Sequence, residues 1–240
     1  MTGMRVLVCD KLSPEGIDIL TPYFSVEEVY GLSEDDLITI IDNYDAMIVR
    51  SRTRVSSRII RAGKKLKIIG RAGVGLDNID IDTANEKGVL VVNSQEGNTV
   101  SAAEFTLAML LSISRNIPFA HNSVQEGKWN RSQFSGMELY GKVLGIVGLG
   151  KIGCRLAEYA LCLGMKVIAS DTRVNRKCLK GRDIEVIDLD ALCEKSDYIS
   201  FHIPKTKETA GMVDHRLFNK MKDGVFIVNC SRGGIVVEKD

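Results

Sequence analysis

Three glycines with the spacing G-x-G-x-x-G lie between a short apolar run, residues 143–147, and a segment of helical periodicity, residues 152–163. In a strand-turn-helix of this kind the first glycine permits the tight turn, the second lets the backbone approach a pyrophosphate, and the third lets the helix pack close to the strand. The N–H groups that open such a helix lack acceptors and carry its positive dipole end, which stabilises a diphosphate. The spacing therefore predicts a dinucleotide site. Its expected contacts are Gly148, Gly150, Lys151, Ile152 and Gly153.

An acidic residue stands where the second strand of this unit would end. Residues 166–169 form a short β-rich run, and Asp171 follows it. A carboxylate there accepts hydrogen bonds from both adenosine ribose hydroxyls and repels a 2′-phosphate, which favours NAD over NADP. Arg173 lies close enough in sequence to keep NADP as the alternative. Packing alone is another use of three glycines, but the strand, the helix and the terminal acid together favour the cofactor site.

The composition excludes several classes of function. The 240 residues are 45% apolar, which is enough for one large or two modest domains with buried cores. Basic and acidic residues number 32 and 31 and leave a formal net charge of +1, so there is no general attraction to nucleic acid or to a membrane. No apolar segment approaches the ~20 residues that span a bilayer, and residues 1–9 lack signal-peptide character.

Cysteine usage predicts a reduced, cytoplasmic protein without a metal site. No two cysteines have C-x-x-C spacing, and the chain has only three histidines. Reduced thiols and no structural zinc site are therefore expected. The six cysteines are Cys9, Cys154, Cys162, Cys178, Cys193 and Cys230.

The elements that must position these residues alternate between strand and helix. In the first half this alternation predicts a parallel sheet covered by helices, with ligands beyond the carboxyl ends of the strands, at loops 50–51, 70–77 and 93–98. The predicted strands are residues 5–9, 26–30, 46–49, 67–69 and 89–92, and the predicted helices are residues 14–20, 34–41, 56–62 and 82–87. In the second half, after Asp171, the predicted strands are residues 184–186, 198–202 and 225–229, and the predicted helices are residues 189–195 and 215–221.

Residues 101–115 predict a helix that bridges the halves. Ser101 and Glu104 can form a capping box, and the segment is apolar on more than one face. Such a helix requires cover from an interdomain core, from a second subunit or from within the same subunit. Trp129 follows in a polar loop, where its large surface also suggests cover by a domain or a subunit partner.

Five motifs together resemble one family. They are GRAGVGLDNID at residues 70–80, GNTVSAAE at 97–104, GKVLGIVGLGKIG at 141–153, HIPKTKET at 202–209 and NCSRGGIV at 229–236. In this order they resemble the D-isomer-specific 2-hydroxyacid dehydrogenases over nearly the whole chain. The resemblance implies an α/β fold of two parallel sheets, with a flavodoxin-like substrate-binding domain at residues 1–98 and a Rossmann NAD-binding domain at residues 99–240. It also implies a homodimer or higher homo-oligomer, formed through the nucleotide-binding domains.

The resemblance also implies roles for residues. Arg232 matches the family's catalytic arginine, whose guanidinium binds the substrate carboxylate and polarises the C2 oxygen. Arg50 and Arg71 are candidates for the substrate's carboxylate and phosphate, with a surface cation as the alternative, and Arg131 is a weaker candidate to reach a partner's site. The implied substrate contacts are Arg50, Arg71, Gly73 and Val74. The further implied cofactor contacts are Val74, His202, Ile203, Pro204, Cys230, Ser231 and Arg232.

His202 invites assignment as the general acid or base, because it is the only histidine in a site-like motif. The resemblance instead places it in the cofactor wall. The family's catalytic histidine and the glutamate that holds it lie downstream of the arginine, so the sequence is expected to be a C-terminally truncated piece of a longer parent chain. The parent is expected to oxidise a D-2-hydroxy acid with NAD, first of all 3-phosphoglycerate to 3-phosphohydroxypyruvate in serine biosynthesis. The alternatives are a non-catalytic NAD-binding protein and a glycerate, hydroxypyruvate or lactate dehydrogenase.

Overall fold

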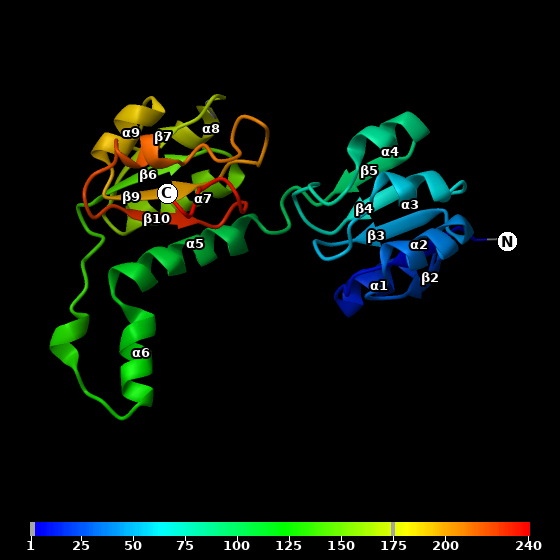
Figure 1. Cartoon of the computed structure of the whole chain (residues 1–240), viewed down its shortest axis with the longest axis horizontal. Helices are drawn as coiled ribbons and strands as arrows, with labels where there is room; N and C mark the ends of the chain where they lie inside the picture. The colour runs from blue at the N-terminus through cyan, green and yellow to red at the C-terminus, as the bar shows by residue number, and fades with distance from the viewer. Residues whose placement is uncertain (1–2, 174–175) are drawn as a thin grey trace. The chain divides into compact units, whose positions relative to one another are not determined.

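A computed structural model describes residues 3–173 and 176–240. The chain folds as two compact units, Met1–Asn98 and Thr99–Asp240, drawn in Figure 1. Within the described ranges each unit contains one five-stranded parallel sheet with a buried core of its own. The predicted α/β class with two parallel sheets is therefore confirmed.

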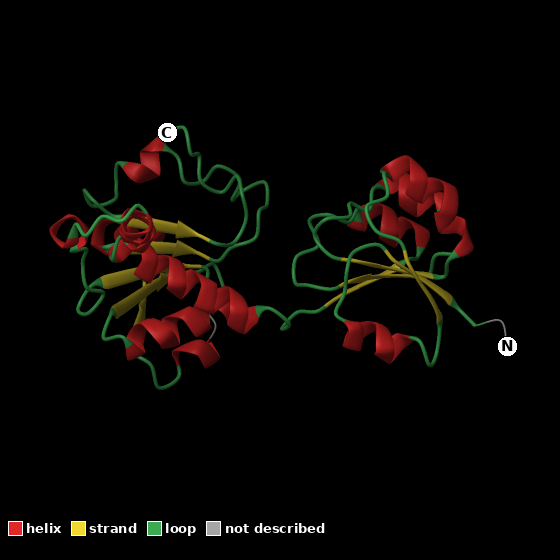
Figure 2. Cartoon of the chain, turned by 90° about the horizontal axis from the view of Figure 1, so that it is seen from below, coloured by secondary structure: helices red, strands yellow, loops and turns green. Residues whose placement is uncertain are grey.

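The first unit alternates strand and helix from its beginning. Its strands are β1 (Arg5–Val8), β2 (Ser25–Glu28), β3 (Ala46–Val49), β4 (Ile68–Arg71) and β5 (Leu90–Asn93), and its helices are α1 (Pro14–Leu20), α2 (Glu34–Ile40), α3 (Ser57–Ala62) and α4 (Ile81–Lys87), with a 3₁₀ turn η1 (Ile41–Asn43). The strand order is β2-β1-β3-β4-β5, and helices cover both faces of the sheet (Figure 2). Because the order reverses between β1 and β3, the carboxyl ends of these two strands form a topological switch point.

The second unit has a second sheet of the same kind. Its strands are β6 (Val143–Val147), β7 (Lys166–Ser170), β8 (Ile184–Val186), β9 (Tyr198–Phe201) and β10 (Phe226–Asn229), and its helices are α5 (Thr99–Ser114), α6 (Ile117–Gln125), α7 (Lys151–Cys162), α8 (Arg176–Leu179), α9 (Leu189–Lys195) and α10 (His215–Phe218), with a 3₁₀ turn η2 (Arg131–Phe134). The strand order is β10-β9-β6-β7-β8, with Leu144 in register between Val167 and Tyr198. The switch point of this sheet lies between β6 and β9.

The central strands of the second sheet are apolar because both faces are covered. Leu144 and Ile146 of β6 enter one buried cluster, whereas Val147 enters the cluster on the opposite face. The same alternation holds in β9, where Tyr198 enters the first cluster and Phe201 the second. A shift of one residue in the pairing of these strands would move each side chain to the opposite face of the sheet. The apolar pattern therefore fixes the register, and with it the alignment of the strand ends.

Helix α5 is covered within its own unit on one face only. Its buried residues, which include Leu110 and Ser114, face inward, and Ser114 Oγ hydrogen-bonds Tyr198 Oη of β9 at 3.0 Å. Phe105 remains 57% exposed. The predicted Ser101 capping box is wrong, because α5 begins at Thr99 and Ser101 therefore lies inside its first turn.

Trp129 lies in a loop as predicted, and this loop is flanked by helix α6 and the turn η2, which the sequence did not predict. Asn116, with φ of 52°, turns the chain in the left-handed region before α6, and Pro118 fits its first turn. Trp129 is 76% exposed, so its own unit does not cover it. None of the helices in the described residues is long and apolar enough to cross a membrane.

Candidate functional site

The glycine turn, Gly148–Gly153, begins where β6 ends, at the switch point of the second sheet. Gly148 has φ of +98°. A Cβ there would lie 2.7 Å from the carbonyl oxygen of His202 and 2.8 Å from Cγ2 of Ile203. Glycine is required at this position both for its backbone conformation and for the approach of the segment that follows β9.

The other two glycines of the turn differ in the space around them: Gly150 faces open space, and Gly153 is tightly packed. A Cβ on Gly150 would meet nothing within 4 Å, whereas a Cβ on Gly153 would lie 2.1 Å from the carbonyl oxygen of Gly148. Gly150 is also the N-cap of α7 and supplies no side-chain acceptor to the first N–H groups of that helix. Open space before these N–H groups, at the positive end of a 12-residue helix, suits an anionic diphosphate.

Asp171 is held beside this turn. One oxygen of its carboxylate accepts a hydrogen bond from the Leu149 N–H at 2.6 Å, and the other accepts one from the Arg173 N–H at 2.7 Å. The backbone of Gly148 donates to the Ser170 carbonyl at 2.9 Å, which joins the end of β7 to the same turn. Since each carboxylate oxygen has two lone pairs, Asp171 retains acceptor capacity for two hydroxyl groups.

His202 lies behind the turn as a buried, neutral side chain. Its Nε2 is 2.9 Å from the Ser200 hydroxyl, and its backbone N–H donates to the Val147 carbonyl at 2.8 Å. Burial lowers the pKa of His202 to about 4. At neutral pH this imidazole is not protonated to imidazolium, and a pKa this low makes it a weak base, which agrees with the predicted place of His202 in the cofactor wall. Pro204 follows, and its carbonyl accepts from Thr209 Oγ1 at 2.6 Å.

Arg232 stands on a turn at the carboxyl end of β10. Asn229 builds this turn, because its amide donates to the Arg232 carbonyl at 2.9 Å and its Oδ1 accepts from the Ser231 N–H at 3.1 Å and from Ser231 Oγ at 2.7 Å. The Arg232 guanidinium donates to the Ser231 carbonyl at 2.9 Å. Cys230 packs against the core. The sheet order β10-β9-β6 thus sets the Arg232 turn, the His202 segment and the glycine turn along one edge.

In the first unit, Arg50 follows β3 at the switch point. Its backbone N–H donates to the buried carboxylate of Asp10 at 2.6 Å, and its guanidinium donates to the Lys11 carbonyl at 3.3 Å. Thr53 donates to the same carboxylate through its N–H at 3.1 Å and through its hydroxyl at 3.0 Å. Asp10 therefore fixes the loop that carries Arg50.

Arg71, Gly73 and Val74 lie together after β4. A Cβ on Gly73 would lie 2.0 Å from Arg71 Nη1, so the absence of a side chain at Gly73 makes room for the guanidinium. The Val74 carbonyl accepts from the Asn93 amide at 2.5 Å, which links the ends of β4 and β5. These residues share the carboxyl edge of the first sheet with Arg50.

Sequence reasoning missed two further cations at this edge. Arg52 and Arg54 line a hollow of about 530 Å³ together with Asp10 and Thr53. The signal was present in the sequence Arg50-Ser51-Arg52-Thr53-Arg54, where basic side chains alternate directly after a strand. The chain bends at residues 51–53 after β3, and this bend brings Arg52 and Arg54 to the hollow, which the sequence pattern did not predict.

Comparison with known proteins identifies the family. Residues 107–240 match the sequence model described as "D-isomer specific 2-hydroxyacid dehydrogenase, NAD binding domain". The chain belongs to this family. Its second unit is therefore an NAD-binding domain, which confirms the cofactor predicted from the glycine turn.

Relatives of the D-isomer-specific 2-hydroxyacid dehydrogenase family match along nearly the whole chain. A D-3-phosphoglycerate dehydrogenase of Synechocystis is 49% identical over 99% of this chain and 43% of its own length, and that of Bacillus subtilis is 44% identical over 98% and 44%. The chain thus spans less than half the length of these curated relatives. The NAD⁺-bound 3-phosphoglycerate dehydrogenase of Entamoeba histolytica has 31% identity and a TM-score of 0.83, and it is matched over 99% of this chain and 74% of its own.

The residues of the second unit fit NAD. A Cβ on Gly150 would meet no atom within 4 Å, which leaves open space for a diphosphate at the start of α7, and the Asp171 carboxylate, bonded to the Leu149 N–H of the same turn, has acceptors for ribose hydroxyls. Lys151 and Ile152 are the first two residues of the helix that faces this cradle. Assignment of the individual contacts remains a prediction.

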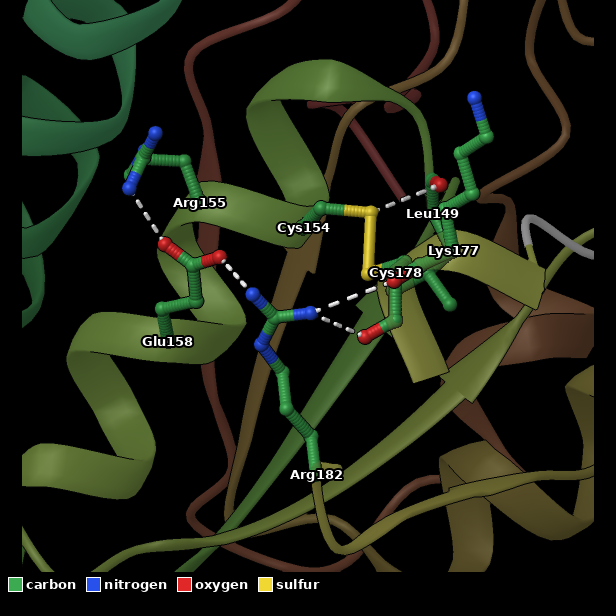
Figure 3. Close-up of polar contacts among 7 residues, drawn as sticks. All are labelled: Leu149, Cys154, Arg155, Glu158, Lys177, Cys178 and Arg182. Atoms are coloured by element: carbon green, nitrogen blue, oxygen red, sulfur yellow. Dashed lines mark hydrogen bonds and ion pairs between the residues drawn. A yellow bond between two sulfur atoms is a disulfide. The ribbon is translucent and has the colours of Figure 1, made fainter. Parts of the chain in front are cut away.

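The prediction that all cysteines are reduced is wrong. Cys154 and Cys178 form a disulfide across 24 residues, as Figure 3 shows. The sequence argument relied on C-x-x-C spacing, but a disulfide requires only that the two Cα atoms approach closely, and α7 and α8 bring them to 5.7 Å. Among the described residues no group of three or more histidine, cysteine or acidic side chains could hold a metal ion.

Proposed function

We propose that the whole protein carrying this sequence oxidises the C2 hydroxyl of 3-phosphoglycerate with NAD and forms 3-phosphohydroxypyruvate. The observation that carries the proposal is the position of Arg232, whose turn shares one sheet edge with the glycine turn and is separated from it by a single strand, β9. The relatives named as D-3-phosphoglycerate dehydrogenases, at 44 and 49% identity, support this substrate over an unphosphorylated acid.

The proposal gives each residue of the second unit a task. NAD, when bound, supplies the two-electron oxidising capacity. The N–H groups at Lys151 and Ile152 bind its diphosphate, and Asp171 accepts hydrogen bonds from the adenosine ribose. The Arg232 guanidinium binds the substrate carboxylate and polarises the C2 oxygen, because a planar fork of donors matches a carboxylate in two places.

The anionic groups of the substrate require further cations. Arg50 and Arg71 are proposed to bind the carboxylate and the phosphate, and the hollow beside Asp10 adds Arg52 and Arg54 to this set. The hydroxyl proton requires an acceptor other than His202, since burial holds the pKa of that side chain at about 4. The resemblance assigns this task to a histidine downstream of Arg232.

Steady-state rates of NADH formation test the proposal. The whole protein is expected to oxidise 3-phosphoglycerate with NAD far faster than glycerate or lactate. Arg232→Lys should lower kcat/KM about 100- to 1,000-fold, because an ammonium keeps the charge but loses the bidentate fork. Tight NAD binding without turnover on any 2-hydroxy acid would instead support a non-catalytic NAD-binding protein, and faster oxidation of glycerate or lactate would correct the substrate.

The proposal includes a homo-oligomer, a cytoplasmic location and a place in serine biosynthesis. Exposed apolar side chains on α5, on α6 and in the segment that follows support the oligomer: Phe105, Phe119, Trp129 and Tyr140 are 57, 67, 76 and 77% exposed. Arg131 lies in η2, within the same segment. Cell fractionation and the serine requirement of a deletion strain test the other two statements.

A further inference from the structure

Two links hold the short helix α8 against α7 beside the glycine turn (Figure 3). The first is the Cys154–Cys178 disulfide. The second is Arg182, which donates to the Cys178 carbonyl at 2.7 Å and to the Lys177 carbonyl at 3.4 Å, and also pairs with Glu158 of α7. Both links join the same two helices, one by a covalent bond and the other by charge and hydrogen bonds.

The disulfide is next to the residues proposed to bind NAD. Cys154 directly follows Gly153, the third glycine of the turn, and its Sγ lies 3.2 Å from the Leu149 carbonyl oxygen. The N–H of the same Leu149 donates to Asp171 at 2.6 Å. The disulfide therefore closes a covalent ring that contains β7 and Asp171 and returns to the glycine turn.

Helix α8 depends on these links for its position. It has four residues, and Cys178 is the one that is buried. A helix this short has no stability of its own in water, so its links to α7 and the packing of Cys178 and Leu179 against the core hold it in place. Opening the disulfide removes the covalent link that ties α8 to the end of the glycine turn.

We propose that Cys154 and Cys178 form a reversible redox latch that sets the affinity of the second unit for the adenosine half of NAD. This inference rests on the proposed NAD contacts at Asp171 and the glycine turn. In the disulfide form the turn, Asp171 and α8 are pre-organised, and NAD binds tightly. In the dithiol form α8 keeps its Arg182 contacts and the packing of Cys178 and Leu179 against the core but loses its covalent link to α7, so the turn and Asp171 are less pre-organised and affinity falls.

A dithiol reduces the Cys154–Cys178 disulfide in two thiol–disulfide exchange steps. A thiolate of the reductant attacks Cys154, the partly exposed member of the pair, forms a mixed disulfide with it and expels the Cys178 thiolate. The second thiolate of the reductant then closes its own disulfide and releases the Cys154 thiolate. Both protein thiolates take up protons, so two electrons and two protons reach the protein. A small-molecule disulfide reverses the sequence.

After reduction, the Cys154 thiol and helix α8 still have hydrogen-bond partners. A Cys154 thiol can donate to the Leu149 carbonyl, already 3.2 Å away, and Arg182 with Glu158 continues to hold α8. The fold therefore does not depend on the disulfide. In a cytoplasmic setting a disulfide is usually transient and regulatory, which agrees with a latch better than with a permanent crosslink.

Two other cysteines are poor candidates for the same chemistry, and a third provides a control. Burial raises the pKa of the Cys9 thiol to about 12 and that of the Cys193 thiol to about 11, which removes the reactive thiolate at neutral pH. Cys162 is exposed and lies at the far end of α7, outside any disulfide. It provides a matched control, since it shares a helix with Cys154 but is distant from the glycine turn.

Calorimetric titration of the protein with NAD and with ADP-ribose tests the latch. Each ligand is titrated into protein treated with dithiothreitol or with its oxidised form, and thiol counting by mass spectrometry verifies the state of the pair. We expect the Kd for both ligands to rise about fivefold on reduction, because ADP-ribose contains the whole adenosine and diphosphate portion. Cys162→Ser should behave like the wild type. Cys154→Ser and Cys178→Ala should bind like the reduced wild type under both treatments.

The outcomes separate the latch from the proposed function. Equal affinities in the two verified redox states, or six free thiols in protein treated with the oxidant, would overturn the latch and leave NAD binding intact. A redox effect on NAD that is absent with ADP-ribose would overturn its assignment to the adenosine half. Failure to bind NAD in either state, with the fold intact by circular dichroism, would overturn the proposed NAD contacts and the latch with them.

Discussion

At the scale of single residues, the glycine turn shows two different reasons for lacking a side chain. Gly153 is glycine because a Cβ would lie 2.1 Å from the carbonyl oxygen of Gly148, so the constraint comes from the fold. Gly150 faces open space, and its backbone angles, φ −74° and ψ −163°, suit other residues. Folding therefore does not require glycine at Gly150, and binding is the remaining physical reason for it.

Substitution by alanine should affect NAD binding at Gly150 and stability at Gly153. Gly150→Ala is expected to leave thermal stability unchanged and to weaken NAD binding at least tenfold, because its methyl group occupies the diphosphate cradle. Gly153→Ala is expected to lower the free energy of unfolding by about 1–3 kcal/mol, because backbone must shift. Calorimetric titration and chemical denaturation measure the two effects. Unchanged NAD affinity in Gly150→Ala would contradict the assignment of the cradle.

His202 predicts a pH dependence of stability. Its pKa is about 4 in the folded state, below the ordinary value of 6.5, because the imidazole is buried. Between these values the unfolded chain binds a proton that the folded chain does not, so the free energy of unfolding falls as the pH falls from 6.5 to 4 and is independent of this group above 6.5. The full loss is ~3 kcal/mol at ~1.4 kcal/mol per pKa unit.

Urea denaturation at pH 7 and at pH 4.5 measures this effect. The comparison is between the wild type and His202→Gln, which keeps a side-chain amide near the Ser200 hydroxyl but does not titrate in this range. The loss of stability on acidification should be smaller in the variant. An equal loss in both proteins would show that other groups account for the pH dependence.

At the scale of elements, α5 and α6 present more apolar surface than their unit covers. Leu110 of α5 is fully buried, whereas Phe105 of the same helix is 57% exposed and Phe119 of α6 is 67% exposed. Sequence patterning showed that α5 is apolar on several faces, but it could not decide which faces the unit itself covers. That choice depends on where α7 and β9 lie against it.

Substitution on α6 should change association and leave folding intact. Phe119→Ser is expected to weaken the proposed oligomer about 30-fold in Kd, on the scale of an aromatic interface residue worth about 2 kcal/mol. Size-exclusion chromatography with light scattering, across a range of concentrations, measures the change. Tyr23→Ser is the control, since Tyr23 is an aromatic residue of the first unit with 75% exposure. Equal dissociation constants for the two variants would place the interface elsewhere.

At the scale of the whole molecule, the two units have separate hydrophobic cores. The core of the first unit includes Leu7, Met47 and Ile69, and the cores on the two sheet faces of the second unit share no residue with it. Units with cores of their own can unfold in separate steps. The NAD contacts proposed at the glycine turn belong to the second unit alone.

Scanning calorimetry with NAD should therefore shift one of two unfolding transitions. A ligand at about 100 times its Kd stabilises the folded state that binds it by about 2.7 kcal/mol, which raises that transition by several degrees. The transition of the first unit should stay unchanged. Gly150→Ala provides the control, because the transition of its second unit should lose most of the shift at the same NAD concentration. Equal shifts of both transitions would show that the units bind NAD or unfold together.

The sequence by itself determined the α/β class, most strands and helices to within a few residues, the glycine turn at Gly148–Gly153, and NAD as the cofactor. These follow from local rules: apolar runs bounded by turns, helical periodicity and glycines at a fixed spacing. It failed at α6, where a left-handed Asn116 starts a short helix, and at Ser101, because α5 begins at Thr99, three residues before the start that an N-cap at Ser101 predicts.

Only the tertiary structure decided which distant residues meet. It showed that His202 is partly buried with a lowered pKa, that Arg52 and Arg54 join Asp10 at a hollow, and that Cys154 meets Cys178. Each of these depends on the packing of elements that are separated in the chain, and burial and approach distances have no local signature. Residue spacing along the chain predicts local structure such as turns and helices. A pKa shift and a disulfide depend instead on which distant residues the fold places in contact.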